Sequence, residues 1–285
     1  MKKIVAFIML LCLLFTNFSF ALDLNATVHY LAKQELDAWG ILALYSNSSN
    51  IENRSLEKIN SSKITTDYES YIMGAISLGL DVSEYAAQIT AAQQENGKFA
   101  DLIHAEGNDL VNSHIWGIIS LYVSDHETYN KELALAWLKS QQNEDGGFPV
   151  FTGLTVSDPD LTAMGIVAYH ILGLDENSPE IQKAFAFIEK SLQKQESCET
   201  LSWYILAKKK LGLPVSESLY KNLLSYQLND GSFKHLKESK NGNYIATWHA
   251  LLALSDCQNE ISIFDQLHNK SKQRHEQKEN ENHKI

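Results

Sequence analysis

The chain has few cysteines, no excess of positive charge and, beyond its first residues, no long apolar run. Its 24 Lys and Arg residues against 35 Asp and Glu residues give a net charge of −11 at pH 7. That charge argues against nucleic acid and against anionic membrane surfaces as partners. A bilayer span needs roughly 20 apolar residues, and no segment after residue 21 provides them. The sequence therefore predicts no membrane span in the mature chain.

The one long apolar run lies at the N-terminus. Lys2 and Lys3 precede the apolar residues 4–15, and Ser19 and Ala21 are small residues at the −3 and −1 positions of a cleavage site. This pattern predicts a signal peptide over residues 1–21 and a secreted, periplasmic or extracellular protein. A membrane anchor is the alternative, but the apolar run is short for one. Cleavage removes two lysines and no acidic residue, so the mature chain carries a net charge of −13.

A six-residue pattern recurs six times along the chain. Successive copies begin 34, 43, 48, 39 and 46 residues apart, at Trp39, Met73, Trp116, Met164, Trp203 and His249. Periods of about 20–50 residues indicate an array of structural repeats. Four copies carry Gly at the second position, although Gly within a helix costs about 1 kcal/mol relative to Ala. This recurrence predicts close approach of neighbouring helices at the glycines.

Two kinds of helix alternate in the predicted repeats. The signature segments, such as residues 116–123, are apolar on all sides, which is typical of buried helices. Amphipathic segments lie between them, for example residues 133–138, 181–192 and 219–226. Three turns follow amphipathic segments and combine Asn-Gly or Asp-Gly with a later Phe, which we expect to pack into the core; they span residues 94–99, 142–148 and 227–233.

This alternation predicts an all-α single domain, an α6/α6 toroid of six inner and about six outer helices over residues 22–268. A helix near residues 261–267 would be the sixth outer helix and close the ring. An open solenoid is the alternative, but its period would be more constant. The polar residues 269–285 cannot bury a core, so we expect a disordered tail.

Two cysteines remain after signal cleavage, Cys198 and Cys257. Secretion favours a disulfide, but the repeat register does not. Cys198 precedes Trp203 by five residues, whereas Cys257 follows His249 by eight. Neighbouring parallel helices would then separate the two by roughly 20 Å along the axis, beyond the reach of a disulfide. We expect two unpaired thiols.

The turns and the helices that follow them resemble the prenyltransferase/squalene-cyclase repeat superfamily. The best copy runs from Trp137 through Gln142 and Phe148 to Asp160, and the resemblance covers about residues 30–268. Members include terpene cyclases, protein prenyltransferase β subunits, cobalamin carriers and many secreted bacterial proteins. The resemblance implies the α/α toroid, but one fold hosts several activities.

The cyclase motif Asp-Xaa-Asp-Asp-Thr-Ala is matched in part by residues 158–163, with Leu161 in place of the last Asp. The resemblance makes Asp160, with Asp158 beside it, the candidate catalytic residue, because burial and a neighbouring carboxylate can keep an Asp protonated. Helix capping is the alternative. The repeats favour capping, since acidic or amide residues recur four positions before the signature, at Glu35, Glu69, Asn112 and Glu199.

Other chemistries of the superfamily have weaker matches. Residues 196–198 only loosely match the Asp-Xaa-Cys pair of zinc prenyltransferases, and Ala246 stands where a His ligand is expected. Thioester domains need Cys-Gly-Glu-Gln, whereas Cys198 is followed by Glu199. The small β domain that completes a cobalamin site has no match here. We therefore expect no metal, and the sequence identifies no cofactor.

The candidate ligand-binding residues are aromatic, since such side chains suit flat or apolar ligands if they line a central cavity; they are Trp39, Trp116, Trp203, His114 and His249. Packing between inner and outer helices is the alternative. Two functions stay open: a secreted, monomeric, non-catalytic module that binds a small apolar ligand or an envelope or extracellular protein, and a secreted enzyme that uses an acidic pair at the toroid mouth on a terpenoid or glycan.

Overall fold

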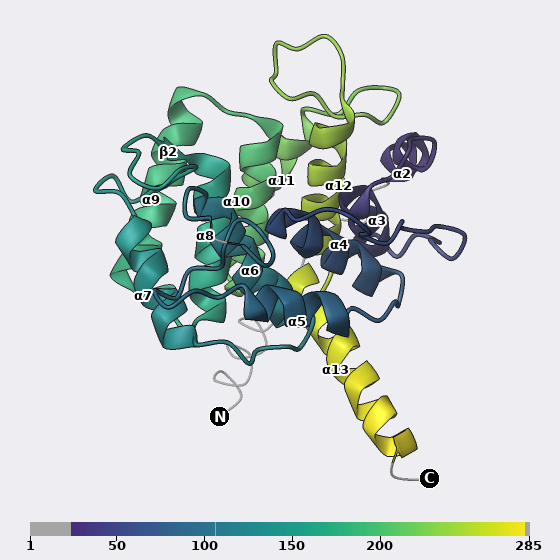
Figure 1. Cartoon of the computed structure of the whole chain (residues 1–285). Helices are drawn as coiled ribbons and strands as arrows, with labels where there is room; N and C mark the ends of the chain where they lie inside the picture. Colours follow the sequence, from purple (N-terminus) through teal and green to yellow (C-terminus); the bar gives the residue numbers. More distant parts are fainter. Residues whose placement is uncertain (1–23, 106, 283–285) are drawn as a thin grey trace, which may run out of the picture.

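The computed structural model describes residues 24–105 and 107–282. The predicted signal peptide, residues 1–21, lies outside the described residues. Within them the regular structure is almost entirely helical, as predicted (Figure 1). The strands β1 (Phe148–Pro149) and β2 (Ser157–Asp158) have two residues each and pair antiparallel.

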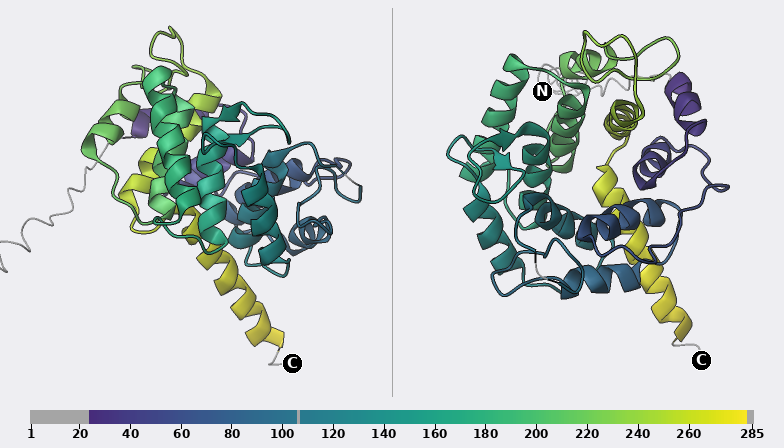
Figure 2. Two further views of the ribbon diagram at one scale, coloured as in Figure 1. Left: turned by 90° about the vertical axis from the view of Figure 1, so that its left-hand side faces the viewer. Right: turned by 45° about the horizontal axis from the view of Figure 1, so that its top comes forward.

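Six inner helices form a closed ring (Figure 2). Each packs against the next, and the last packs against the first. They are α3 (Ala38–Ser46), α4 (Thr65–Ser77), α6 (Val111–Val123), α8 (Pro159–Ile171), α10 (Cys198–Lys210) and α12 (Tyr244–Gln258). Each contains one signature segment, and most of its residues are buried. The closed ring confirms the toroid prediction.

Five outer helices cover five of the six gaps between inner helices: α2 (Asn25–Ala32), α5 (Ser83–Ala91), α7 (Lys131–Gln141), α9 (Pro179–Lys194) and α11 (Glu217–Leu224). α2 packs between α12 and α3, so the first described helix covers the gap between the last and first inner helices. Between α3 and α4 the chain forms an irregular loop over residues 47–64 instead.

The helix predicted near residues 261–267 exists, but its predicted place in the ring is wrong. α13 (Ile263–Asn282) packs against α4, α6 and α10, which are not three consecutive inner helices, so it crosses one end of the ring. Its last turns project beyond the other helices (Figures 1 and 2). The expected disorder from residue 269 is also wrong as far as Asn282.

The basic side chains of α13 explain why this polar segment is ordered. Lys270 Nζ donates a hydrogen bond to the backbone oxygen of Ser77 at 2.9 Å, and Arg274 donates to that of Gly79. These carbonyls lie at the end of α4, where backbone acceptors lack helical partners and the helix dipole is negative. Composition alone assigns such basic side chains to solvent, whereas here Lys270 and Arg274 cap the end of α4.

The signature glycines give room to side chains from other elements. A Cβ on Gly165 would lie 2.5 Å from the ring of Phe148, and one on Gly117 would lie 2.7 Å from the ring of Phe99. Phe99 and Phe148 therefore each pack on the glycine of the next inner helix, whereas α12, which follows Phe233, has Ala250 in place of the glycine. At Gly74 the close neighbour is the backbone of α3, at Ala38 Cα. The predicted helix approach is thus confirmed at Gly74. A buried Phe ring takes its place at Gly117 and Gly165, and the Tyr244 hydroxyl of α12 takes it at Gly40.

The repeated turns connect each outer helix to the next. Their glycines have positive φ, and a Cβ there would lie within 2.4 Å of a backbone atom in the following outer helix; they are Gly97, Gly146 and Gly231. Gln227 Nε2 also donates to Thr27 Oγ1 at 2.7 Å. Because Thr27 belongs to α2, the last turn closes the layer against the first helix.

The two ends of the ring differ. Segments that precede the inner helices pair by backbone hydrogen bonds with the repeated turns and the loops around them, for example Ile64 opposite Leu102 and Leu110 opposite Phe151. We call this end, where the inner helices begin, the N-terminal mouth. The opposite end, which α13 crosses, is the base.

Cys198 and Cys257 are both free, as the repeat register predicts, and Cys198 is fully buried. In the part of the chain that the structure describes, no helix has the length and apolar character that a membrane span requires.

Candidate functional site

Aromatic rings meet across the centre of the toroid. The rings of Trp39 and Trp116 are 4.7 Å apart, and those of Trp116 and Trp203 are 5.5 Å apart. These residues lie on α3, α6 and α10, which are not neighbours in the ring, so the contacts pass through the central space. We call Trp39, Trp116, Trp203, Trp248 and His249 the aromatic plug.

The aromatic plug leaves little of its surface to solvent. Trp203 is 1% exposed and Trp116 5%, while Trp39 is half-buried. Trp39 stands in the first turn of α3, two residues after its N-cap Asp37, so its free surface lies at the N-terminal mouth. It stacks on Trp248 with the rings 5.4 Å apart and 10° from parallel. The rings thus form a floor beneath the mouth.

The space between this floor and the base is also crossed by side chains. Lys210 Nζ donates to Tyr122 Oη at 3.0 Å and lies 4.1 Å from the centre of its ring. These residues come from α10 and α6, again non-neighbouring helices, and both contact Asp265 of α13. These contacts occupy the space between the aromatic plug and the base.

The two candidate histidines have different places. His249 belongs to the plug, 3.5 Å from the ring of Trp248, and burial lowers its pKa to about 3. His114 lies between the inner and outer layers, where its Nε2 is 3.0 Å from the backbone oxygen of Ala134 on α7. Burial lowers the pKa of His114 to about 3 as well. Both are neutral near pH 7, and the structure does not bring His114 to the mouth.

Asp158 caps α8. Its carboxylate accepts a hydrogen bond from the backbone N–H of Leu161 at 2.7 Å, the geometry of an N-cap. Asp160 lies two residues further into the same helix and accepts from Thr200 Oγ1 on α10. The capping alternative therefore describes Asp158, while Asp160 connects two inner helices.

Two buried carboxyl groups near the mouth have unusual surroundings. Both carboxylate oxygens of Glu69, near the start of α4, are buried without a hydrogen-bond partner, and burial raises the pKa of Glu69 well above its ordinary value.

Asp160 is the second of these carboxyl groups. Burial raises the pKa of Asp160 most, and the negative charges of Asp158 and Glu199 raise it further. The hydrogen bond from Thr200 lowers it, and the result is a pKa of about 6. Glu199, on α10, lies 2.7 Å from His235 Nδ1. Asp160, Glu199 and His235 form what we call the acidic side of the mouth.

The loosely matched zinc residues do not converge. Glu196 accepts hydrogen bonds from Asn222 and Tyr226 and pairs with Lys237 at 2.8 Å. Cys198 Sγ instead contacts the backbone oxygen of Ala246 at 3.5 Å, and burial raises the pKa of its thiol well above the ordinary value. Zinc binds thiolates, so this donor set does not fit a zinc site. Within residues 24–105 and 107–282, no group of three or more His, Cys, Asp or Glu could hold a metal ion.

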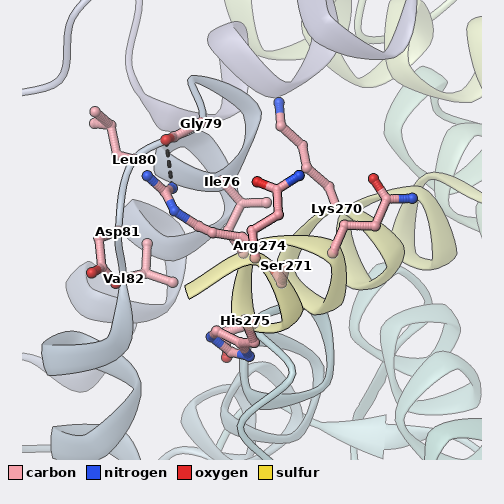
Figure 3. Close-up of a pocket in the computed structure, with 12 residues that line it drawn as sticks. Ile76, Gly79, Leu80, Asp81, Val82, Lys270, Ser271, Arg274 and His275 are labelled. Atoms are coloured by element: carbon pink, nitrogen blue, oxygen red, sulfur yellow. Dashed lines mark hydrogen bonds between the residues drawn. The ribbon is translucent and has the colours of Figure 1, made fainter. Parts of the chain in front are cut away.

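A pocket of about 310 Å³ lies at the base beside α13 (Figure 3). Its basic side chains already have partners: Arg274 binds the Gly79 oxygen, and His275 Nδ1 lies 3.0 Å from Asp125. The end of α4 is also the negative end of its dipole, which disfavours an anion. These residues hold α13 on the base, and we assign them no ligand.

Sequence reasoning missed several residues of the mouth. Trp248 precedes the signature residue His249, and a test for apolar character one position before each signature would have found it. Nothing local marks Thr200 or His235, because each meets its partner only through the fold.

No family model and no curated protein matches the sequence. Among solved structures, the protein is similar to Candida albicans protein geranylgeranyltransferase-I complexed with GGPP, with 11% sequence identity and a TM-score of 0.58. The match covers 82% of this chain and 90% of that one. The chain has the α/α toroid fold. At this identity the likeness shows the fold alone.

Proposed function

We propose that the protein is a secreted, non-catalytic binding module that takes up its ligand or partner at the N-terminal mouth. The observation that carries this proposal is the aromatic plug, which occupies the central space and leaves Trp39 partly exposed at the mouth. A partner therefore binds on the floor and walls of the mouth and not deep within the toroid. The signal-peptide pattern supports export, and the fold also serves carriers.

The chemistry of the mouth supports binding more than turnover. Neither neutral histidine faces a nucleophile, Asp158 is engaged as a helix cap, and the zinc residues of related transferases have no converging counterpart. Aromatic faces beside carboxylates suit apolar groups and cations, the latter through cation–π contacts.

Site-directed photocrosslinking tests the proposal. A photoreactive amino acid at Val156, on the mouth, is compared with one at Leu133, an exposed residue of α7 on the outer layer. Each protein is irradiated in an extracytoplasmic extract of its own organism. We expect a discrete adduct from position 156 alone, and its loss when Trp39→Ala is added. Equal adducts from both positions, or none from 156, would refute the proposal.

An enzyme with an acidic residue at the mouth is the second candidate, favoured by one observation, the raised pKa of Asp160 beside Glu199. A carboxylic acid that titrates near neutral pH is suited to proton transfer. Asp160→Asn separates the two functions once a ligand is known. A binding module keeps most of its affinity, whereas an enzyme keeps binding and loses turnover by about 10²-fold or more.

A further inference from the structure

Exposed apolar side chains gather at the N-terminal mouth. Of the ten large hydrophobic residues that are exposed in the described part of the chain, seven lie on segments that lead into inner helices or begin them: Ile64, Leu102, Val150, Phe151, Leu154, Val156 and Ile245. Phe151 is 48% exposed and Val156 78%. Monomeric proteins rarely gather apolar side chains on one face unless the face has a partner.

Backbone pairing holds these side chains together. Ile64 lies opposite Leu102 in an antiparallel bridge, and Leu110 opposite Phe151. Directly opposite residues in such pairs project from the same face. The loop between β1 and β2 adds Leu154 and Val156. We call Ile64, Leu102, Val150, Phe151, Leu154 and Val156 the apolar rim, which runs along the mouth over α4, α6 and α8.

The apolar rim ends at the acidic side of the mouth. Val156 leads into β2 and then to Asp158 and Asp160, and Glu199 follows on the neighbouring α10. Basic groups also lie along this path. They are the exposed Lys63 beside Ile64, the exposed His104 after Leu102, and His235, which pairs with Glu199 and is flanked by Lys234 and Lys237. An occupant of the rim that extends toward α10 therefore meets carboxyl groups.

We infer that the apolar rim and the acidic side together dock an extended segment of a partner polypeptide, one that carries apolar side chains and Lys or Arg. This inference rests on the proposed function and names the partner chemistry. The rim spans three repeats, more than a small ligand covers, and the carboxylates complement basic side chains. The acidic mouth and the net charge of −13 of the mature chain repel an anionic lipid surface.

Three short synthetic peptides test the inference on the full mature chain. One alternates Leu and Lys, one alternates Leu and Glu, and one alternates Ser and Lys. We expect only the Leu–Lys peptide to bind, with affinity that falls as salt rises, and to protect residues 149–157 from hydrogen exchange. The variant F151S/V156S should weaken this binding at least about tenfold, and Glu199→Gln should weaken it and reduce its salt dependence. Ile261→Ser, an exposed apolar residue near the start of α13, is the matched control and should change nothing.

Several outcomes would overturn the inference. Equal binding of the Leu–Glu peptide would exclude a preference for basic side chains. Binding of the Leu–Lys peptide by F151S/V156S at the wild-type level would exclude the apolar rim as the binding surface. Rim-dependent sedimentation with phosphatidylcholine–phosphatidylglycerol vesicles would assign the rim to a lipid surface, and rim-dependent dimerisation in solution would assign it to a second copy. Mouth-specific photocrosslinking without Leu–Lys binding would leave the proposed function intact and refute only this inference.

Discussion

At the scale of single residues, the environment of a carboxyl group or an amine depends on partners far away in the sequence. Asp160 meets Thr200, 40 residues on, and Lys210 meets Asp265, 55 residues on. The sequence favoured helix capping at the position of Asp160, but the structure places the N-cap two residues earlier, at Asp158. The sequence left the role of Asp160 open, because that role depends on the neighbouring inner helix.

Asp160 should make stability depend on pH. Its folded pKa of about 6 lies above the ordinary value of 3.8, so between these values the folded protein holds a proton that the unfolded chain has lost. Stability therefore falls as pH rises from about 4 to about 6 and then levels off. Asp160→Asn should remove this fall and raise the free energy of unfolding by about 1–2 kcal/mol at pH 7. Urea unfolding at pH 4 and pH 7 measures the effect, and an unchanged pH profile would contradict it.

Lys210 should be essential to the base. Its side chain is 5% exposed and binds Asp265 and Tyr122. Burial raises the pKa of Asp265, but the hydrogen bond and charge of Lys210 outweigh it and leave that pKa below its ordinary value. Lys210→Met leaves the partly buried carboxylate of Asp265 without its ion-pair partner and should destabilise the protein by about 2–4 kcal/mol. Lys139→Met, which breaks the more exposed pair with Glu180, should cost less than about 1 kcal/mol. Urea unfolding measures both losses. Similar losses of unfolding free energy in Lys210→Met and Lys139→Met would argue against an essential role for Lys210 at the base.

At the scale of helices and turns, the two repeated patterns act on each other. The turn Phe of one repeat fills the space that the glycine of the next inner helix leaves free. The sequence predicted both the buried Phe and a packing reason for the glycine, since each recurs at a fixed place. That they meet could not be predicted, because they are separated by a loop of variable length, as the unequal repeat periods indicate.

Gly165→Ala should therefore destabilise the protein although Ala favours helix. The added methyl lies 2.5 Å from the ring of Phe148, and overpacking of this kind costs about 1–3 kcal/mol. Phe148→Leu should relieve the clash, so the double variant is expected to lose less than the sum of the single losses. Thermal unfolding of the wild-type chain, the two single variants and the double variant gives the coupling energy between Gly165 and Phe148. If the losses of the single variants simply add in the double variant, the two residues do not pack against each other as described.

At the scale of the whole molecule, the toroid has one closed end and one accessible end. α13 covers the base through contacts with carbonyl groups and charges at the ends of α4, α6 and α10. The turns and loops at the other end surround the mouth, with the aromatic plug beneath them. The proposed binding surface lies at the accessible end.

Removal of residues 269–285 tests the role of α13. The truncated chain loses the caps that Lys270 and Arg274 place on α4, as well as the pair of Lys278 with Asp81. We expect the Tm to fall by about 5–10 °C, as a loss of about 2–4 kcal/mol implies for a chain of this size. Scanning calorimetry measures the difference. A Tm equal to that of the full chain would mean that the contacts of α13 beyond His268 contribute no stability.

The sequence by itself determined the repeat, the alternation of buried and half-buried helices and hence the ring, because periodic burial is written into local residue patterns. It also determined that the two thiols are unpaired, through their register. Only the tertiary structure decided that the signature aromatics meet across the centre, that α2 closes the outer layer and that α13 covers the base. These depend on which distant surfaces come together once the ring closes, and a one-dimensional pattern specifies how much of a helix is buried but not what it is buried against.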